Sequence, residues 1–143
     1  MTIAVDFDGT IVEHEYPKIG KELPFACATL KQLIADGHKL VLWTVREGEL
    51  LDEAVAWCRE RGVIFYAVNQ NFDEDAPERE KNENYSRKLK AQCFIDDRNV
   101  GGMLDWGIIY QLISRKVSLE DYIRNGGEMP DREVKKKRRL WPF

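Results

Sequence analysis

The sequence of 143 residues contains few cysteines and no long apolar run. Its three cysteines, Cys27, Cys58 and Cys93, are an odd number without C-x-x-C spacing, which argues against a disulfide framework and a zinc site. No stretch approaches the run of about 18 apolar residues that spans a membrane, and no basic and apolar leader precedes the first strand-like segment. We therefore expect a protein of the reducing cytoplasm without a membrane partner.

The chain also lacks a strong excess of either charge. Its net charge of −3 gives no class of partner an electrostatic advantage. Hydrophobic residues make up 43% and charged residues 33%, which excludes a disordered chain and favours a globular one. A chain of this length buries one core, so a single domain over residues 1–143 is expected, with the acidic segment 71–80 and the basic tail of about 131–143 as solvated surface.

Short apolar runs rich in β-branched and aromatic residues alternate with helical patterns along the first two thirds of the chain. The runs predict strands over 2–7, 39–44, 63–68 and 91–96. Apolar residues at helical spacing predict helices over about 24–37 and 48–61. Such alternation is typical of a doubly wound α/β domain, whose parallel sheet is covered by helices on both faces. Two further helical patterns follow residue 103, and 107–112 is a candidate fifth strand.

Acidic residues follow the first and the fourth predicted strands. Asp6 and Asp8 end the first run, and Asp96 and Asp97 end the fourth. Ligands of open α/β sheets bind outside the carboxyl ends of the strands. If strands one and four are neighbours, these carboxylates lie close together, which costs free energy unless a cation is bound. Because the ligands are all oxygens, the expected cation is Mg²⁺. The i, i+2 spacing places Asp6 and Asp8 on one side of an extended chain, so that one can attack while the other moves protons.

The residues around these acids suit the same chemistry. Gly9 permits the positive φ or close approach that a sharp exit from a strand needs, and the Thr10 hydroxyl can bind neighbouring backbone. Thr44 ends the second strand, while Trp43 beside it is expected in the core. An anionic nucleophile that attacks a phosphate also needs a basic residue, which Lys88 before the fourth strand could supply.

Four motifs stand in this order along residues 3–99: DFDGT, VLWT, RKLKAQCF and IDDR. Together they resemble the motifs of the haloacid dehalogenase superfamily of phosphohydrolases. The resemblance implies a Rossmann-like three-layer sandwich with the strand order 3-2-1-4-5. Members usually carry a cap domain, for which residues 10–23 and 69–86 leave too little chain. The sequence therefore resembles the small capless type, with a hairpin-like flap over about 10–23 and an open site.

The resemblance also implies a role for each motif residue. Asp6 would be the nucleophile that forms an aspartyl-phosphate, and Asp8 would protonate the leaving oxygen and then activate water. Thr44 would hydrogen-bond the phosphoryl oxygens. Lys88 would orient Asp6, and it is preferred to Lys90 because its spacing to the fourth motif matches that of capless members.

Magnesium is the cofactor that the resemblance implies. The Asp6 carboxylate, the Asp8 backbone carbonyl and Asp96 would hold Mg²⁺, with Asp97 bound directly or through water. The expected activity is Mg²⁺-dependent hydrolysis of a phosphomonoester, and the expected partner is a phosphorylated small molecule or macromolecular end.

The substrate itself is left open by the sequence. An open site suits a phosphate on a macromolecule, or a lid made by the flap or by a second subunit of a homo-oligomer. IDDR and TVREGE weakly resemble the phosphatase half of polynucleotide kinase-phosphatases, in which case Arg46 and Arg98 would clamp phosphate. Structural ion pairs with Glu47 or Asp97 are the equal alternative. The basic tail is weak evidence for nucleic acid. Candidate substrate contacts are Gly9, Thr10, His14, Val45, Arg46 and Arg98.

Two other functions fit part of the pattern. A phosphoacceptor receiver domain also combines acids, Mg²⁺, Thr and Lys on a parallel sheet. Its acceptor Asp follows the third strand, however, where this chain reads VNQN. A non-catalytic module that binds Mg²⁺ or phosphate has no need of Asp8, so the presence of that residue favours the enzyme.

Overall fold

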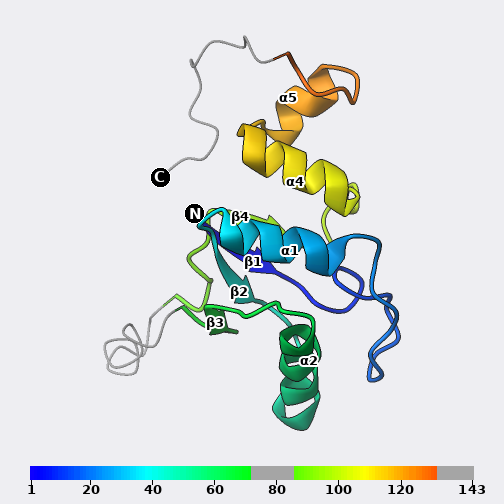
Figure 1. Ribbon diagram of the computed structural model, residues 1–143, viewed down its shortest axis with the longest axis vertical. Coiled ribbons are helices and arrows are strands. Elements are labelled where there is room, and N and C mark those ends of the chain that lie inside the picture. Colours follow the sequence, from blue (N-terminus) through cyan, green and yellow to red (C-terminus); the bar gives the residue numbers. More distant parts are fainter. Residues whose placement is uncertain (72–85, 132–143) are drawn as a thin grey trace. The chain divides into compact units, whose positions relative to one another are not determined.

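The computed structural model of the protein describes residues 1–71 and 86–131 (Figure 1). Most of the predicted acidic segment and nearly all of the basic tail lie outside these residues. The chain divides into two compact units, Met1–Met103 and Leu104–Phe143. Each unit has its own buried residues, and the expectation of a single domain over 1–143 stays a prediction.

A parallel sheet of four strands, in the order β3-β2-β1-β4, forms the centre of the first unit (Figure 1). The strands are β1 (Thr2–Val5), β2 (Lys39–Leu42), β3 (Ala67–Val68) and β4 (Cys93–Ile95). Val5 pairs with Leu42 on one side and with Ile95 on the other, so β1, β2 and β4 end level. The expected α/β fold with a parallel sheet is confirmed, and strand one lies between strands two and four.

The connections between β1, β2 and β3 contain the helices α1 (Ala26–Ala35) and α2 (Gly48–Glu60). In α1, Leu30 and Leu33 are buried at helical spacing, and Gly37 closes the helix with a φ of +95°. Crossovers between parallel strands are right-handed. The crossovers from β1 to β2 and from β2 to β3 run in the same direction across the sheet, so α1 and α2 lie on the same face. Trp57 of α2 packs edge to face on Phe7, with ring centroids 5.8 Å apart. This contact holds α2 beside the exit of β1.

Leu89, in the segment before β4, covers one face of the sheet. Ala4 and Val41 pair in register and therefore share that face. Leu89 forms a buried cluster with them, against which Trp43, Ala67 and Ala91 pack. Because Ile3 on the other face is buried as well, β1 is covered on both sides, as its continuous apolar sequence predicts.

The chain between β1 and α1 is a short hairpin-like flap over about residues 10–23, as predicted. Val12 and Glu22 form an antiparallel bridge, and the Glu13 N–H donates to the Lys21 carbonyl over 2.7 Å. A Cβ on Gly20 would lie 2.9 Å from the Glu13 carbonyl carbon, so only glycine lets the two arms approach this closely. The flap therefore has a defined closed base.

The second unit contains the helices α4 (Trp106–Arg115) and α5 (Leu119–Arg124). The Asp105 carboxylate caps α4 by accepting from the Ile108 N–H over 2.9 Å. Trp106, Ile109, Leu112 and Ile113 form its buried stripe. The candidate strand over 107–112 is therefore wrong: a cap and a helical stripe outweigh the unfavourable Gly107. Within the described residues the sheet has no fifth strand, and no helix is long and apolar enough to cross a membrane.

We predict that Leu89→Ala lowers the free energy of unfolding by about 2–5 kcal/mol, because it opens a cavity against a buried sheet face. The matched control is Ile64→Ala, which removes a similar amount of side chain from an exposed position. Urea unfolding of both variants measures the difference. Equal, small effects would show that Leu89 does not cover the sheet.

Candidate functional site

A pocket of about 410 Å³ opens at the carboxyl edge of the sheet. Asp6 follows β1, Thr44 comes two residues after β2, and Asp96 follows β4. Because these three strands end level, their exits bring the polar side chains together at one place. The residues that line the pocket are Asp6, Asp8, His14, Tyr16, Trp43, Thr44, Val45, Asp96 and Arg98.

Three carboxylates cluster at the exits of β1 and β4, as the sequence predicts. One oxygen each of Asp6, Asp96 and Asp97 lies within 4.8 Å of the others. The pKa of Asp6 rises from 3.8 to about 7, chiefly because burial desolvates the carboxylate, then because of its hydrogen bond with Asp97 and the charge of Asp96. The three carboxylates are therefore close enough together to share one cation.

Gly9 and Thr10 support this cluster from behind. The Thr10 hydroxyl lies 3.2 Å from Asp6 Oδ2 and 3.1 Å from Asp97 Oδ1, and it accepts the Asp97 N–H over 3.0 Å. Gly9 has a φ of +85°, and a Cβ there would lie 2.8 Å from Asp97 Cγ. Neither residue lines the pocket, and both help to position Asp97, so their contact with substrate stays a prediction.

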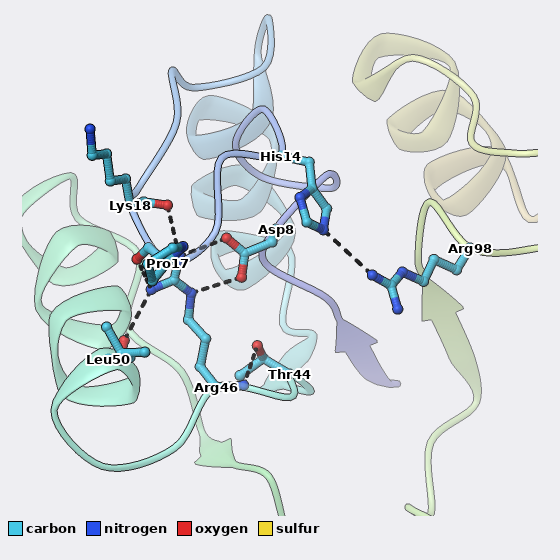
Figure 2. Close-up of polar contacts among 8 residues, drawn as sticks. All are labelled: Asp8, His14, Pro17, Lys18, Thr44, Arg46, Leu50 and Arg98. Atoms are coloured by element: carbon cyan, nitrogen blue, oxygen red, sulfur yellow. Dashed lines mark hydrogen bonds and ion pairs between the residues drawn. The ribbon is translucent and has the colours of Figure 1, made fainter.

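Asp8 forms a buried, two-point ion pair with Arg46 (Figure 2). Arg46 Nε and Nη2 donate to Asp8 Oδ2 and Oδ1, each over 2.7 Å, while the two side chains are 0% and 7% exposed. The remaining Arg46 N–H groups donate to the carbonyls of Pro17 at 3.2 Å, Lys18 at 3.0 Å and Leu50 at 3.4 Å. All five guanidinium donors therefore have an acceptor.

The saturation of Arg46 corrects one sequence-based hypothesis. A guanidinium with no free donor cannot clamp a phosphate, so Arg46 is a structural ion-pair partner, of Asp8 rather than of Glu47. Its hydrogen bonds to Asp8 raise the Arg46 pKa, and burial opposes that rise. Through one side chain the exit of β1, the flap and α2 are held together.

Thr44 presents a hydroxyl to the pocket. Its backbone N–H donates to Asn69 Oδ1 over 2.8 Å, and its Oγ1 accepts the Arg46 N–H over 3.2 Å. The hydroxyl hydrogen has no acceptor among residues 1–71 and 86–131, which leaves it for a ligand. Asn69, just after β3, was missed by sequence reasoning. The feature that identified the acidic residues could have identified Asn69 as well, because it is a polar residue directly after a strand.

The mouth of the pocket is formed by His14 and Tyr16 of the flap, by Val45, and by Arg98 after β4. Arg98 Nη2 lies 3.4 Å from His14 Nε2 (Figure 2). Arg98 makes no ion pair with any acid in the described residues, so the alternative of a structural pair with Asp97 is not realised. The structure thus places His14, Val45 and Arg98 at the pocket, and their predicted contact with substrate stays a prediction.

Comparison with known proteins identifies one relative. No family model and no curated protein matches the sequence. A solved structure of a conserved protein from Bacteroides thetaiotaomicron is 61% identical, with a TM-score of 0.76, and the match covers 85% of this chain and 95% of that chain. The chain belongs to the family of that protein. The relative is described only as conserved, so family membership carries no activity with it.

In this member of the family, neither candidate lysine reaches the acidic cluster. Lys88 and Lys90 are both exposed, and neither lines the pocket. Their backbone N–H groups donate to Ser86 Oγ and Asn71 Oδ1, and within the described part of the chain neither ammonium pairs with an acid. The role of the motif lysine stays a prediction. Trp43, expected in the core, is half-buried and lines the pocket.

We predict that Arg46→Met lowers the free energy of unfolding by about 3–5 kcal/mol, because it leaves the Asp8 carboxylate buried without its partner. Adding Asp8→Asn to this variant should recover part of the loss, since the uncompensated charge is removed. Arg59→Met, at an exposed position on α2, is the control. Additive losses in denaturant unfolding would contradict a direct coupling of the two side chains.

The raised pKa of Asp6 predicts a pH-dependent stability. Asp6 binds its proton more tightly in the folded state, so it contributes stability below pH 3.8 that is lost as the pH rises through about 7. In EDTA, the unfolding temperature should therefore fall between pH 5 and pH 8, and Mg²⁺ should raise it most at pH 8. Asp6→Asn should flatten both effects, whereas the exposed Asp52→Asn should not. A Mg²⁺ effect that survives in Asp6→Asn would place the cation elsewhere.

Proposed function

We propose that the protein is a Mg²⁺-dependent phosphatase of the haloacid dehalogenase type, which hydrolyses a phosphomonoester through an aspartyl-phosphate on Asp6. The observation that carries this proposal is the meeting of Asp6, Asp96 and Asp97 within 4.8 Å, in a pocket that also contains the Thr44 hydroxyl. The order of the four motifs along the chain supports it. The capless three-layer sandwich and a cytoplasmic location belong to the same proposal, supported by the short flap and by three free cysteines.

The acidic cluster fits Mg²⁺ by its chemistry. All its candidate ligands are oxygens, which hard divalent cations prefer. The Asp8 backbone carbonyl accepts no hydrogen bond from residues that the structure describes, so it is free to join Asp6 and Asp96 as a ligand. Mg²⁺ would supply positive charge that neutralises the carboxylates and the substrate phosphate. The raised Asp6 pKa indicates how poorly the cluster tolerates its own charge without such a cation.

The chain's own residues account for both chemical steps. An Asp6 carboxylate oxygen attacks phosphorus as the bond between phosphorus and the leaving oxygen breaks, and that oxygen takes a proton from protonated Asp8. Water then attacks the phosphorus of the aspartyl-phosphate and gives a proton to Asp8, which releases inorganic phosphate and restores Asp6. The two-point pair with Arg46 favours charged Asp8, which suits the second step, in which Asp8 takes a proton from water. The first step requires that this proton sit on the second lone pair of an Asp8 oxygen that Arg46 also holds. The Thr44 hydroxyl would donate to the phosphoryl group during both steps.

We predict that the protein hydrolyses p-nitrophenyl phosphate with Mg²⁺, and that EDTA abolishes the activity. Asp6→Asn should be inactive because an amide cannot form the acyl-phosphate. Asp8→Asn should lose on the order of 10²- to 10⁴-fold in kcat, and more with an alkyl phosphate, whose leaving oxygen needs the proton. Asp52→Asn is the control on the exposed face of α2. Turnover at the wild-type rate in Asp6→Asn would end the assignment of the nucleophile.

A receiver-like or other non-catalytic module predicts a different result in the same assay. After treatment with a small phosphoryl donor, a receiver keeps its acyl-phosphate, which mass spectrometry detects as a stable mass increase. The phosphatase should show that mass increase only in Asp8→Asn, where the second step is slow. A long-lived phosphoprotein in the wild type would favour the receiver.

A further inference from the structure

Two nitrogen-bearing side chains face each other across the mouth of the pocket. His14 comes from the flap and Arg98 from the loop after β4, 84 residues apart in sequence, with 3.4 Å between Arg98 Nη2 and His14 Nε2. Figure 2 shows them on the side of Asp8 that is away from Arg46. Since a guanidinium only donates, His14 Nε2 is the acceptor. The contact is a polar bridge between the flap and the β4 exit.

The position of Arg98 is unexpected for its sequence neighbours. It directly follows Asp96 and Asp97, yet its guanidinium pairs with neither, and only its backbone N–H donates to Asp96 Oδ1, over 2.8 Å. Of its five N–H groups, one is used by His14, and the others have no acceptor in the described residues. Arg46, by contrast, uses all five. Arg46 is therefore saturated, whereas Arg98 still has donors to offer at the pocket mouth.

The location of Arg98 separates it from the reacting centre. Arg98 and His14 are exposed, whereas Asp6 and Thr44 lie half-buried deeper in the pocket. An anion bound at the mouth would therefore belong to the part of a ligand that extends outward.

We propose, on the basis of the phosphatase function above, that Arg98 and His14 form a subsite for a second anionic group on the leaving portion of the substrate. The substrate class is a phosphomonoester that carries a further carboxylate or phosphate next to the ester. The arriving anion takes the free Arg98 donors, while His14, whose Nε2 accepts from Arg98 Nη2, positions the guanidinium at the pocket mouth. Such an anion comes either from a small metabolite or from the first phosphodiester of a phosphorylated polynucleotide end.

The test uses pairs of ligands that differ in one charge. The small-molecule pair is 2-phosphoglycolate and its amide, and the polynucleotide pair is a 5′-phosphorylated thymidine dinucleotide with a phosphodiester or with a neutral methylphosphonate linkage. The wild type should show a higher kcat/KM for the charged member of at least one pair, and that pair identifies the source of the anion. Arg98→Gln should lower this charged-to-neutral ratio by about 10- to 100-fold, the worth of a hydrogen bond between charged groups.

His14→Gln and Arg59→Gln complete the set of variants. His14→Gln should lower the ratio less than Arg98→Gln, and Arg59→Gln, at an exposed position on α2, should leave both the ratio and the activity unchanged. An equal loss on both members of a pair would assign Arg98 to the reacting phosphate and overturn the subsite. So would the absence of any charge preference in the wild type.

A binding measurement keeps this test separate from the phosphatase proposal. Titration calorimetry with Asp6→Asn measures the affinity for the same ligand pairs without turnover. The subsite predicts tighter binding of a charged member, which the additional change Arg98→Gln removes. If Asp6→Asn shows this preference in binding but the wild type hydrolyses neither ligand nor p-nitrophenyl phosphate, the result supports the subsite and rejects the phosphatase. Equal binding of both members would overturn the subsite alone.

Discussion

Arg46 is completely buried, and the region around the pocket is organised by the need to give each of its five N–H groups an acceptor. Asp8 supplies two acceptors, the flap supplies two backbone carbonyls, and α2 supplies one. The rings of Phe7 and Tyr16 lie over the guanidinium, with centroids 5.1 and 5.2 Å away. A buried cation of this kind holds three separate segments in one relative position, because releasing any of them would leave a donor unpaired in the interior.

The carboxylates at the strand exits fall into two groups with opposite electrostatics. Asp8 is matched by Arg46 in a two-point pair. Asp6, Asp96 and Asp97 have no cationic partner in the described part of the chain, and the burial and crowding of this group raise the Asp6 pKa to about 7. The charge of Asp8 is thus neutralised by Arg46 within the protein, whereas Asp6, Asp96 and Asp97 lack such a partner in the described residues. This division is the physical basis for expecting a divalent cation at one place and an ordered proton-transfer group at the other.

The sequence predicted those features that follow from strand order and strand ends. Predicting that Asp6 lies near Asp96 required only the assumption that β1 and β4 are neighbours. Predicting the flap required only the short connection between the first strand and the first helix. The sequence could not distinguish the structural role of Arg46 from the exposed position of Arg98. The ion pair between Arg46 and Asp8 depends on the geometry of two loops, which the spacing of residues in the sequence does not reveal. The apolar run 107–112 was ambiguous between strand and helix, and the cap at Asp105 decided it. The support that Gly9 and Thr10 give to Asp97 was also invisible, since it joins segments nearly ninety residues apart.

The grip of Arg46 on the flap has an evolutionary consequence. It holds Pro17 and Lys18 by their main-chain oxygens, which every amino acid provides. Flap substitutions that leave Tyr16 and Gly20 in place can therefore accumulate without loosening its attachment to the rest of the protein. A lineage could exchange the flap side chains at the pocket mouth while inheriting the carboxylates at the strand ends unaltered, because the attachment to Arg46 constrains only the path of the backbone.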